Sequence, residues 1–516
     1  MRIGDYLKEA GLSLSAFAAR AEVSEAAMSR YAAGKRTPRP EIMHRIVAAS
    51  EGRVQPNDLF AARVETAAER DLLAEVAAVD LLVPDLSGII RGKKLAPDAV
   101  PAVMRNGLAF CASVFALDAT GENVEESGLA MSVGDPDKRL VPADGRLLPV
   151  PWTEEPTAQM LMTMVEADGT PFYGDPRHVL ERVAARFAEL RLKPVAALEL
   201  EFYLVDGRRA PDGAPLPPAS PSSGRRPETV QVYSLDDLDR FAALFRDIRR
   251  ACAAQEVPAH SALSEYAPGQ YEVNLSHVAD PVIAADHAVL LKRIVKGVAR
   301  RHGLEATFMA KPYADRVGSG LHVHLSLLDR SGVNLFAGAG DGDADGMTDA
   351  LRHAIGGLRA TMAESMAIFA PNANSYRRLQ PGAYAPLAPT WGVDNRTVAL
   401  RVPSGPAAGR HLEHRVAGAD ANPYLALAAV LAGVHHGLVE RLDPGPPTDG
   451  NAYEKVAPSL PSRWTEALAR FEEATILPGY FDDAFRRLYA VCKRAEMVKF
   501  DSWVSPLEHE WYLSAL

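Results

Sequence analysis

The first 60 residues repeat apolar side chains at the spacing of α-helices. The apolar residues fall into four groups, one for each expected short helix, with interruptions near Gly11 and Gly34. The groups are Leu7; Leu14, Phe17, Ala18; Met28, Tyr31; and Ile42, Ile46, Val47. Glycine between periodic segments is typical of turns joining short helices. We therefore predict an all-α unit over residues 1–60, followed by a helical linker over residues 61–76.

After the linker the pattern changes to short apolar runs separated by turns. The segments VDLLVPDLSGIIRG (79–92) and VFALDATGENV (114–124) are typical of strands in a small sheet. We expect this sheet to extend to about residue 150, by the same reading of apolar runs.

Helices and strands alternate in the remainder of the chain. Asp175 and Pro176 are typical of a helix start, and the following apolar positions share one face: Val179, Val183, Phe187, Leu190. A strand is predicted from Val195 to Val205. Two more helices carry apolar stripes: Leu238, Phe241, Phe245, Ile248; and Leu290, Leu291, Ile294, Val298. Residues 206–228 hold six prolines and predict an exposed loop.

Composition narrows the class of protein. The 516 residues are 47% hydrophobic and 24% charged, which is typical of globular chains, and the net charge of −10 excludes a surface that is basic throughout. Residues 1–60 carry nine basic and seven acidic side chains, which is a net charge of +2, so the remaining residues carry a net charge of −12. This shift in charge supports a domain boundary after residue 60. Three scattered cysteines argue against a disulfide framework. The most apolar segment, Tyr424–Gly433, is too short to cross a membrane, so we expect a soluble cytoplasmic protein without a membrane partner.

Two carboxylates share one face of the strand ALELEFYLV (197–205). Side chains alternate along a strand, so Glu199, Glu201 and Tyr203 point one way and the leucines and Phe202 the other. Adjacent carboxylates repel each other unless a cation lies between them. The alternative is a solvated face of an edge strand.

Further polar residues repeat this spacing. In LHVHLSL (321–327), His322, His324 and Ser326 share one face, and Gly318 and Gly320 before them permit close backbone approach. Glu413 and Arg415 are also two residues apart. Glu265 and Glu272 flank the Pro-Gly turn of SEYAPGQYEVNL, which could direct both toward one point.

Five carboxylates with one or two imidazoles suit hard divalent ions such as Mg²⁺ or Mn²⁺, and not a cysteine-ligated zinc. Arginines in the same half could bind carboxylate or phosphate: Arg377, Arg378, Arg396, Arg401, Arg415. No P-loop motif is present. Asp341, Asp343 and Asp345 resemble the start of a calcium loop, but Arg352 stands at its twelfth position, which favours a solvated acidic hairpin.

From Val79 to Leu516 the chain resembles the glutamine synthetase family, and within it the γ-glutamylpolyamine (γ-glutamylputrescine) synthetase branch. The resemblance covers about 85% of the chain. The motifs that carry it are VDLLVPDLSGIIRGKK, ALDATG, ELEFYLV, EYAPGQYE, ATFMAKPYADRVGSGLHVHLSL, NSYRRL, WGVDNRTVALRVP, HLEHRVAGADANPYLALAAVLAG and EHEWYLSAL. It implies an α+β fold, with a β-grasp domain over residues 77–165 and a catalytic domain over 166–516 whose curved antiparallel sheet is flanked by helices.

The resemblance also implies roles for individual residues. Two Mg²⁺ or Mn²⁺ ions per active site would be held by two sets of ligands: Glu201, Glu265 and Glu272; Glu199, His322 and Glu413. Glutamate would be bound by Gly318, His324, Arg378 and Arg415. The nucleotide and the transferring phosphoryl group would be contacted by Ser326, Arg396 and Arg401, and also by His324. Catalytic roles would fall to Asp118, lent to the amine site of a neighbouring subunit, and to Arg396 and Glu272. The family forms homo-oligomers, and a dodecamer is expected.

The implied reaction joins ATP, L-glutamate and an amine. ATP phosphorylates the γ-carboxylate of glutamate, and an unprotonated amine then attacks the γ-glutamyl phosphate. Ammonia-using members carry a glutamate in a PGYEAP-like flap, where this chain has Tyr384 in PGAYAP. Val317 and His411 likewise replace an asparagine and an arginine of those members. These departures favour an organic amine, either a polyamine such as putrescine or a monoamine. The alternatives are an ammonia-using glutamine synthetase and a transcriptional regulator whose synthetase-like body senses ligand.

Residues 12–38 resemble a Cro/repressor-type helix-turn-helix. In that reading the second helix begins at Ser24 and presents Glu25, Ala26, Ser29 and Arg30 to the major groove of DNA. Lys35, Arg36 and Arg39 would meet phosphates. The alternative is a small helical bundle used for assembly or partner contact.

Overall fold

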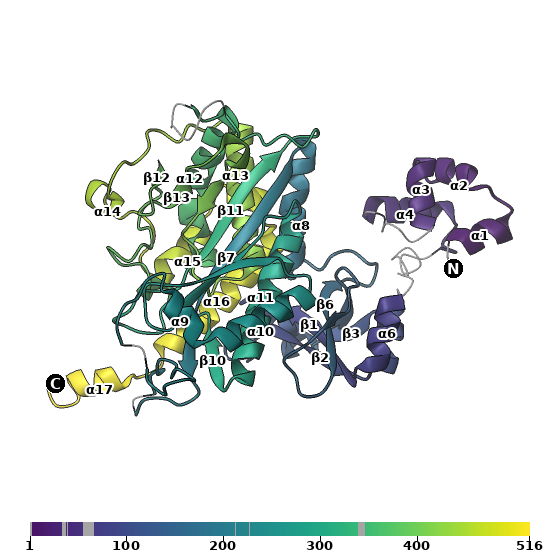
Figure 1. Ribbon diagram of the computed structural model, residues 1–516. Helices are drawn as coiled ribbons and strands as arrows, with labels where there is room; N and C mark the ends of the chain where they lie inside the picture. The colour runs from purple at the N-terminus through teal and green to yellow at the C-terminus, as the bar shows by residue number, and fades with distance from the viewer. Residues whose placement is uncertain are drawn as a thin grey trace. The chain divides into compact units, whose positions relative to one another are not determined.

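The computed structural model describes residues 3–32, 38, 40–54, 67–211, 213–226, 228–338 and 346–516, which form two compact units (Figure 1). The first unit comprises residues 1–83, 90–114 and 131–175. The second comprises residues 84–89, 115–130 and 176–516. The predicted acidic hairpin at 341–345 and the predicted phosphate contacts Lys35, Arg36 and Arg39 lie outside the described residues.

Four short helices near the N-terminus pack around a core of their own: α1 (Ile3–Ala10), α2 (Leu14–Arg20), α3 (Glu25–Ala32) and α4 (Pro40–Ala49). Ser13 caps α2 by accepting a hydrogen bond from the Ala16 amide. Phe17, Met28 and Ile46 are fully buried in this core, as the apolar spacing predicts. Helix α6 (Ala67–Glu75) lies within the predicted linker.

The first unit also holds a six-stranded sheet of order β2-β1-β6-β4-β3, with β5 paired to β6. Its strands are β1 (Ala78–Pro84), β2 (Ile90–Leu95), β3 (Leu108–Cys111), β4 (Asp137–Pro142), β5 (Leu148–Pro149) and β6 (Thr157–Val165), and α7 (Val100–Asn106) precedes β3. The predicted strand 114–124 is wrong. That segment forms a 3₁₀ turn and a single bridge, because the Asp118 carboxylate accepts the Thr120 and Glu122 amides and closes a tight turn.

The second unit is built on an eight-stranded, mostly antiparallel sheet of order β12-β13-β14-β11-β7-β9-β8, with β10 paired to β7. Its strands are β7 (Lys193–Asp206), β8 (Ala259–Ser264), β9 (Gln270–Leu275), β10 (Leu304–Thr307), β11 (Leu321–Leu328), β12 (Trp391–Val393), β13 (Leu400–Val402) and β14 (Leu412–His414). The apolar face predicted for β7 is confirmed: Leu198, Leu200 and Phe202 are fully buried.

Helices form the second layer of this unit: α8 (Pro176–Glu189), α9 (Leu235–Arg240), α10 (Ala242–Ala254), α11 (Pro281–Arg301), α12 (Asp349–Phe369), α13 (Pro423–Glu440), α14 (Ala452–Lys455), α15 (Trp464–Glu472), α16 (Asp483–Asp501) and α17 (Pro506–Tyr512). Helices α8 and α11 pack on β7, and α13 packs against both. Asp286 joins these three helices, since it accepts both Arg177 guanidinium bonds at 3.0 Å and the Tyr424 hydroxyl at 2.7 Å.

Two predicted helices differ from the observed ones. Helix α8 ends at Glu189, so Leu190 does not line its apolar face and is 36% exposed. The stripe through Leu238 and Ile248 spans two helices, α9 and α10, because Phe241 (φ −114°, ψ 24°) leaves the helical conformation between them. Among the described residues, no helix is long and apolar enough to cross a membrane.

Candidate active site

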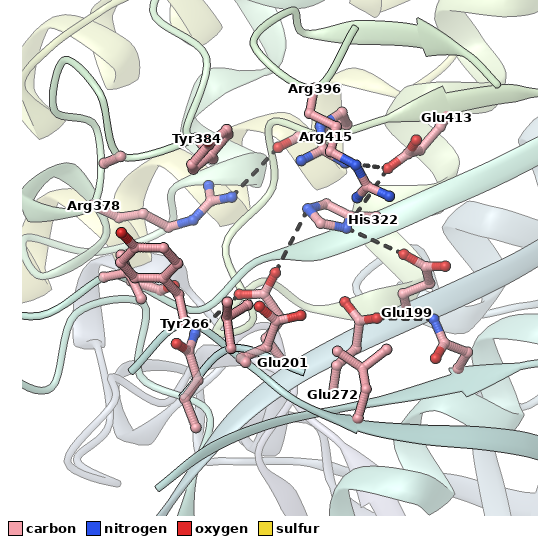
Figure 2. Close-up of a pocket in the computed structure, with 18 of the residues that line it drawn as sticks. Glu199, Glu201, Tyr266, Glu272, His322, Arg378, Tyr384, Arg396, Glu413 and Arg415 are labelled. Atoms are coloured by element: carbon pink, nitrogen blue, oxygen red, sulfur yellow. Dashed lines mark hydrogen bonds and ion pairs between the residues drawn. The ribbon is translucent and has the colours of Figure 1, made fainter. Parts of the chain in front are cut away.

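Strand register brings carboxylates of β7 and β9 together with His322 of β11 in one pocket (Figure 2). On β7, Glu199 lies opposite His322 of β11, and Glu201 lies opposite Glu272 of β9. The His322 Nδ1 is 3.3 Å from Glu199 Oε2, and its Nε2 is 3.9 Å from Glu201 Oε1. Glu199 and His322 are more than 120 positions apart in the sequence, yet they lie side by side in the sheet.

Backbone and amide donors hold the Glu201 carboxylate in place. The Gly320 amide donates to Glu201 Oε2 at 2.8 Å, and the Gln270 side chain donates to the same oxygen at 3.3 Å. A Cβ on Gly320 would lie 2.8 Å from Arg378 Nη2 and 3.0 Å from His322 Nε2. Glycine at 320 therefore leaves room for the ends of the Arg378 and His322 side chains to lie against the backbone.

Glu413 extends the cluster from β14. It lies opposite His324 of β11 and opposite Arg401 of β13, and its carboxylate accepts Arg401 Nη1 at 2.8 Å and is ion-paired with Arg415. Burial disfavours ionisation of Glu413, but Arg415, His322 and His324 outweigh it and bring its pKa to about 2. At this end of the site, the negative charge of Glu413 is balanced by neighbouring arginines.

At the other end of the site, carboxylates repel one another. Burial and the charge of Glu201 raise the pKa of Glu265 to about 8, and burial with Glu199 and Glu201 raises the pKa of Glu272 well above its ordinary value. Burial also opposes ionisation of Glu199, but His324 and His322 outweigh it and lower its pKa. Repulsion of this kind is relieved when a divalent cation binds between the carboxylates.

Two overlapping groups of ligand atoms have the spacing of metal sites. Oxygens of Glu201, Glu265 and Glu272 lie within 4.8 Å of one another. Glu199, Glu272 and His322 form a second group with the same limit, and His322 Nδ1 is 3.9 Å from Glu413 Oε1. The donor set of carboxylate oxygens and imidazole fits a hard divalent ion.

These groups line a cavity of about 520 Å³. Most of the predicted site residues line it: Glu199, Glu201, Glu265, Glu272, Gly318, His322, His324, Arg378, Tyr384, Arg396, Arg401, Glu413, Arg415. Ser326 does not, although it is buried on the same strand as His324. Asp118 does not either: it pairs with Lys499 at 2.7 Å, and although burial opposes ionisation, Lys499 and Thr120 lower its pKa to about 2.

The arginines of the cavity have donors to spare. Arg378 is buried and donates to the Val416 carbonyl at 2.8 Å. The Nε atoms of Arg401 and Arg415 are buried without a hydrogen-bond partner among the described residues. Buried unsatisfied donors are costly, so their position beside a cavity indicates that it receives an anionic ligand.

Sequence reasoning missed two groups of residues at this site. Gln270 and Asn274 share a strand face with Glu272, and Asn274 donates to Glu272 at 3.0 Å; the two-residue spacing that identified Glu199 and Glu201 could have found them. The rim residues Val232, Tyr233 and Tyr266 come from irregular segments, which have no periodicity that predicts their place.

Comparisons with known proteins identify the family. Residues 173–512 match the family model described as the catalytic domain of glutamine synthetase. The chain is 43% identical over 436 residues to γ-glutamylputrescine synthetase of Escherichia coli (84% of this chain, 91% of that one). It is 34% identical to γ-glutamylethanolamide synthetase of Streptomyces coelicolor (84% and 92%) and 32% identical to glutamate–isopropylamine ligase of a Pseudomonas species (84% and 94%). The solved structure of ligand-free GmaS aligns with a TM-score of 0.74 at 29% identity, covering 87% of this chain and 100% of that one.

The raised carboxyl pKa values predict that binding of a divalent cation depends on pH. Below about pH 8 the Glu265 carboxyl is protonated, so a cation must displace that proton and binds more weakly as the pH falls. We expect the affinity for Mn²⁺ to fall from pH 8 to pH 6, by up to about tenfold per pH unit for each proton that the ion displaces, with proton release at pH 7. Isothermal titration in buffers of different ionisation enthalpy measures both quantities.

The matched variants are Glu265→Gln, which should reduce this pH dependence, and Glu305→Gln at a half-buried position of β10, where Glu305 is ion-paired with Arg209 away from the cavity, which should preserve it. An Mn²⁺ affinity that stays constant from pH 6 to pH 8 would show that these carboxylates do not bind the ion.

Proposed function

This chain belongs to the glutamine synthetase family, and on that premise we propose that it is an ATP-dependent ligase joining the γ-carboxylate of glutamate to an organic amine. The observation that carries the proposal is one cavity in which repelling carboxylates lie beside arginines with unused donors. A site that must bind cations, a carboxylate and phosphates together needs both kinds of charge at close range.

The carboxylates would hold two Mg²⁺ or Mn²⁺ ions. Glu201, Glu265 and Glu272 are the proposed ligands of the first, and Glu199, His322 and Glu413 those of the second. Ions held there supply positive charge that offsets the phosphoryl and carboxylate oxygens during transfer.

Glutamate would lie against Gly318, Arg378 and Arg415, with His324 between it and the nucleotide. The planar guanidinium of an arginine suits two-point binding of a carboxylate. The nucleotide would lie toward Arg396, Arg401 and Ser326. Arg396 is exposed at the cavity and free to reach the phosphoryl group as it moves.

The chemistry follows from the weak electrophilicity of a carboxylate. A γ-carboxylate oxygen attacks the terminal phosphorus of ATP, ADP leaves, and the resulting γ-glutamyl phosphate has a good leaving group. The amine nitrogen then attacks the carbonyl carbon, and phosphate departs. The amine must first lose its ammonium proton, and we propose that Asp118 from a neighbouring subunit of a homo-oligomer, a dodecamer by family resemblance, takes part together with Glu272.

The rim of the cavity supports an organic amine over ammonia. Tyr384 (52% exposed), Tyr266 (48%) and Tyr233 (60%) line it. Aromatic rings offer apolar surface to an alkyl chain and attract a cationic end by about 0.5–1 kcal/mol at exposed positions. The named substrates of the three relatives, putrescine, ethanolamine and isopropylamine, are all small alkyl amines or their derivatives.

An amine screen that follows glutamate-dependent phosphate release tests this proposal. We expect turnover with putrescine or a small monoamine and much less with ammonium. Tyr384→Glu should lower kcat/KM for the alkyl amine by about tenfold, or about 1.4 kcal/mol, because it removes the ring, and should raise turnover with ammonium. Tyr384→Phe keeps the ring and should behave as the parent.

Two results would contradict the proposal. Turnover with ammonium equal to that with any organic amine would favour an ammonia-using synthetase. No turnover, together with ligand-dependent DNA binding, would favour a transcriptional regulator.

We further propose that the N-terminal helices bind DNA. Helices α2 and α3 pack together, and Ser24, Glu25, Ser29 and Arg30 are all exposed at or along α3. An exposed second helix beside a packed first one is the arrangement that a helix-turn-helix uses to enter the major groove. The basic excess of this segment supports contact with phosphates.

Fluorescence anisotropy with the full chain and a random-sequence duplex tests DNA binding. We expect salt-dependent binding that weakens about tenfold in Arg30→Ala, because that side chain is exposed on α3. Arg330→Ala, at an exposed loop of the second unit, should leave it unchanged. If the chain does not bind DNA at low salt, the DNA-binding proposal is wrong and the alternative, a helical bundle used for assembly or partner contact, is favoured.

A further inference from the structure

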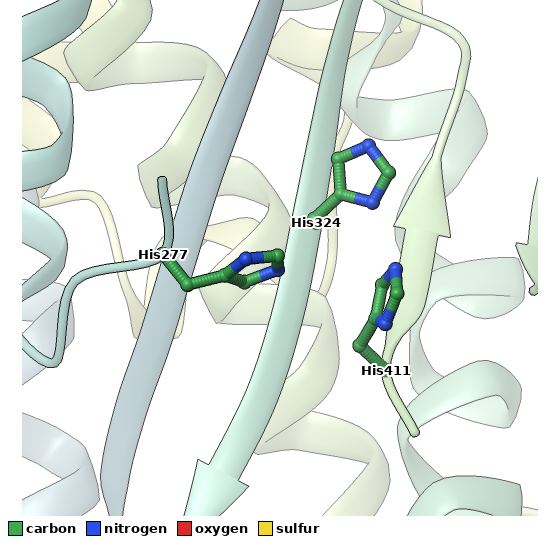
Figure 3. Close-up of side chains that lie close together, drawn as sticks. All are labelled: His277, His324 and His411. Atoms are coloured by element: carbon green, nitrogen blue, oxygen red, sulfur yellow. The ribbon is translucent and has the colours of Figure 1, made fainter. Parts of the chain in front are cut away.

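Three histidines from separate segments meet beside the carboxylates (Figure 3). His277 follows β9, His324 lies on β11, and His411 directly precedes β14. The ring centroids are 6.0 Å apart for His277 and His324, 5.4 Å for His277 and His411, and 5.0 Å for His324 and His411. One ring nitrogen from each lies within 4.8 Å of the others, which is the spacing of ligands around a common ion.

Hydrogen bonding leaves ring nitrogens available as ligands. His411 Nδ1 is 2.9 Å from the Gly409 carbonyl, which can only accept, so Nδ1 carries the proton and Nε2 keeps its lone pair. His324 is buried, and its Nδ1 has no hydrogen-bond partner among the described residues. A buried, unpartnered ring nitrogen facing two other imidazoles is accounted for if an ion binds there.

The surroundings provide an entry and a partner for the buried ring. His277 is exposed, His411 is half-buried and His324 is buried, so the group leads from solvent to the interior. Glu199 Oε1 lies 3.0 Å from His324 Nε2, the ring nitrogen that does not face the other histidines, and Glu199 also belongs to the carboxylate cluster. A carboxylate beside one ring nitrogen orients the ring and leaves the other nitrogen free to bind an ion.

We propose that His277, His324 and His411 form a third metal site, selective for a borderline divalent ion of the Zn²⁺ class and distinct from the two carboxylate sites. Three imidazoles match the ligand preference of Zn²⁺, Co²⁺, Ni²⁺ and Cu²⁺, with water as the remaining ligand, whereas Mg²⁺ prefers oxygen ligands. The site does not depend on the proposed reaction, because it is defined by imidazole geometry. Glu199 connects the two kinds of site, so Zn²⁺ at the histidines should weaken Mn²⁺ binding at the carboxylates.

The test uses the full chain with Mg²⁺ in large excess, so that the carboxylates are occupied, and no ATP, glutamate or amine. After incubation with Zn²⁺ and gel filtration, elemental analysis should find one Zn²⁺ per chain. His277→Gln and His411→Gln should each weaken Zn²⁺ binding by about 100-fold or more. His509→Gln, an exposed histidine on α17, should bind as the parent does.

Mn²⁺ binding without Zn²⁺ serves as the second measurement, since it should persist in both histidine variants and shows that they are folded. Zn²⁺ that remains bound in His277→Gln and His411→Gln, or no Zn²⁺ retained by the parent chain, would overturn the proposal. Either result leaves the ligase assignment unaffected, because no substrate is present.

Discussion

The candidate active site is governed by the mutual repulsion of carboxylates that the strands of one sheet bring together. Glu199, Glu201, Glu265 and Glu272 converge from β7, β9 and the turn before β9, and only Glu413 at the other end is paired with arginines. Burial and the neighbouring carboxylates raise the pKa values of Glu265 and Glu272, so a cation that binds between them has to displace protons. A divalent cation bound between these carboxylates would stabilise all of them in the ionised form.

The pairing register of β7 with its neighbouring strands keeps these carboxylates at one site. Side chains alternate along a strand, so a slip of one residue on β7 would turn Glu199 and Glu201 toward the helices and bring Leu200 into the cavity. The fully buried Leu198 and Leu200 of β7 oppose such a slip, because they would lose the packing of this face of β7 against α8 and α11. Apolar packing on one face thus fixes the geometry of the charges on the other.

The same alternation explains how much could be predicted from sequence. The face shared by Glu199 and Glu201 and the face shared by His322 and His324 both follow from local patterns, and the structure has them. The α+β fold with a curved sheet came from family resemblance and is also confirmed. Which strands pair, and hence that Glu201 faces Glu272, is a long-range property that no single segment encodes.

Local patterns failed where side chains or distant segments decide the structure. Asp118 binds nearby amides and closes a turn where apolar spacing predicts a strand. Phe241 interrupts a stripe that reads as one helix. The meeting of His277, His324 and His411 depends on a loop, a strand and a strand entrance, so no spacing in the sequence signals it.

Anomalous diffraction from crystals grown with Mn²⁺ and ADP tests the central claim most directly, since it locates the ions themselves. The account predicts two peaks in the cavity, one among Glu201, Glu265 and Glu272 and one among Glu199, His322 and Glu413. Peaks confined to other parts of the chain, or a cavity without any peak, would contradict it.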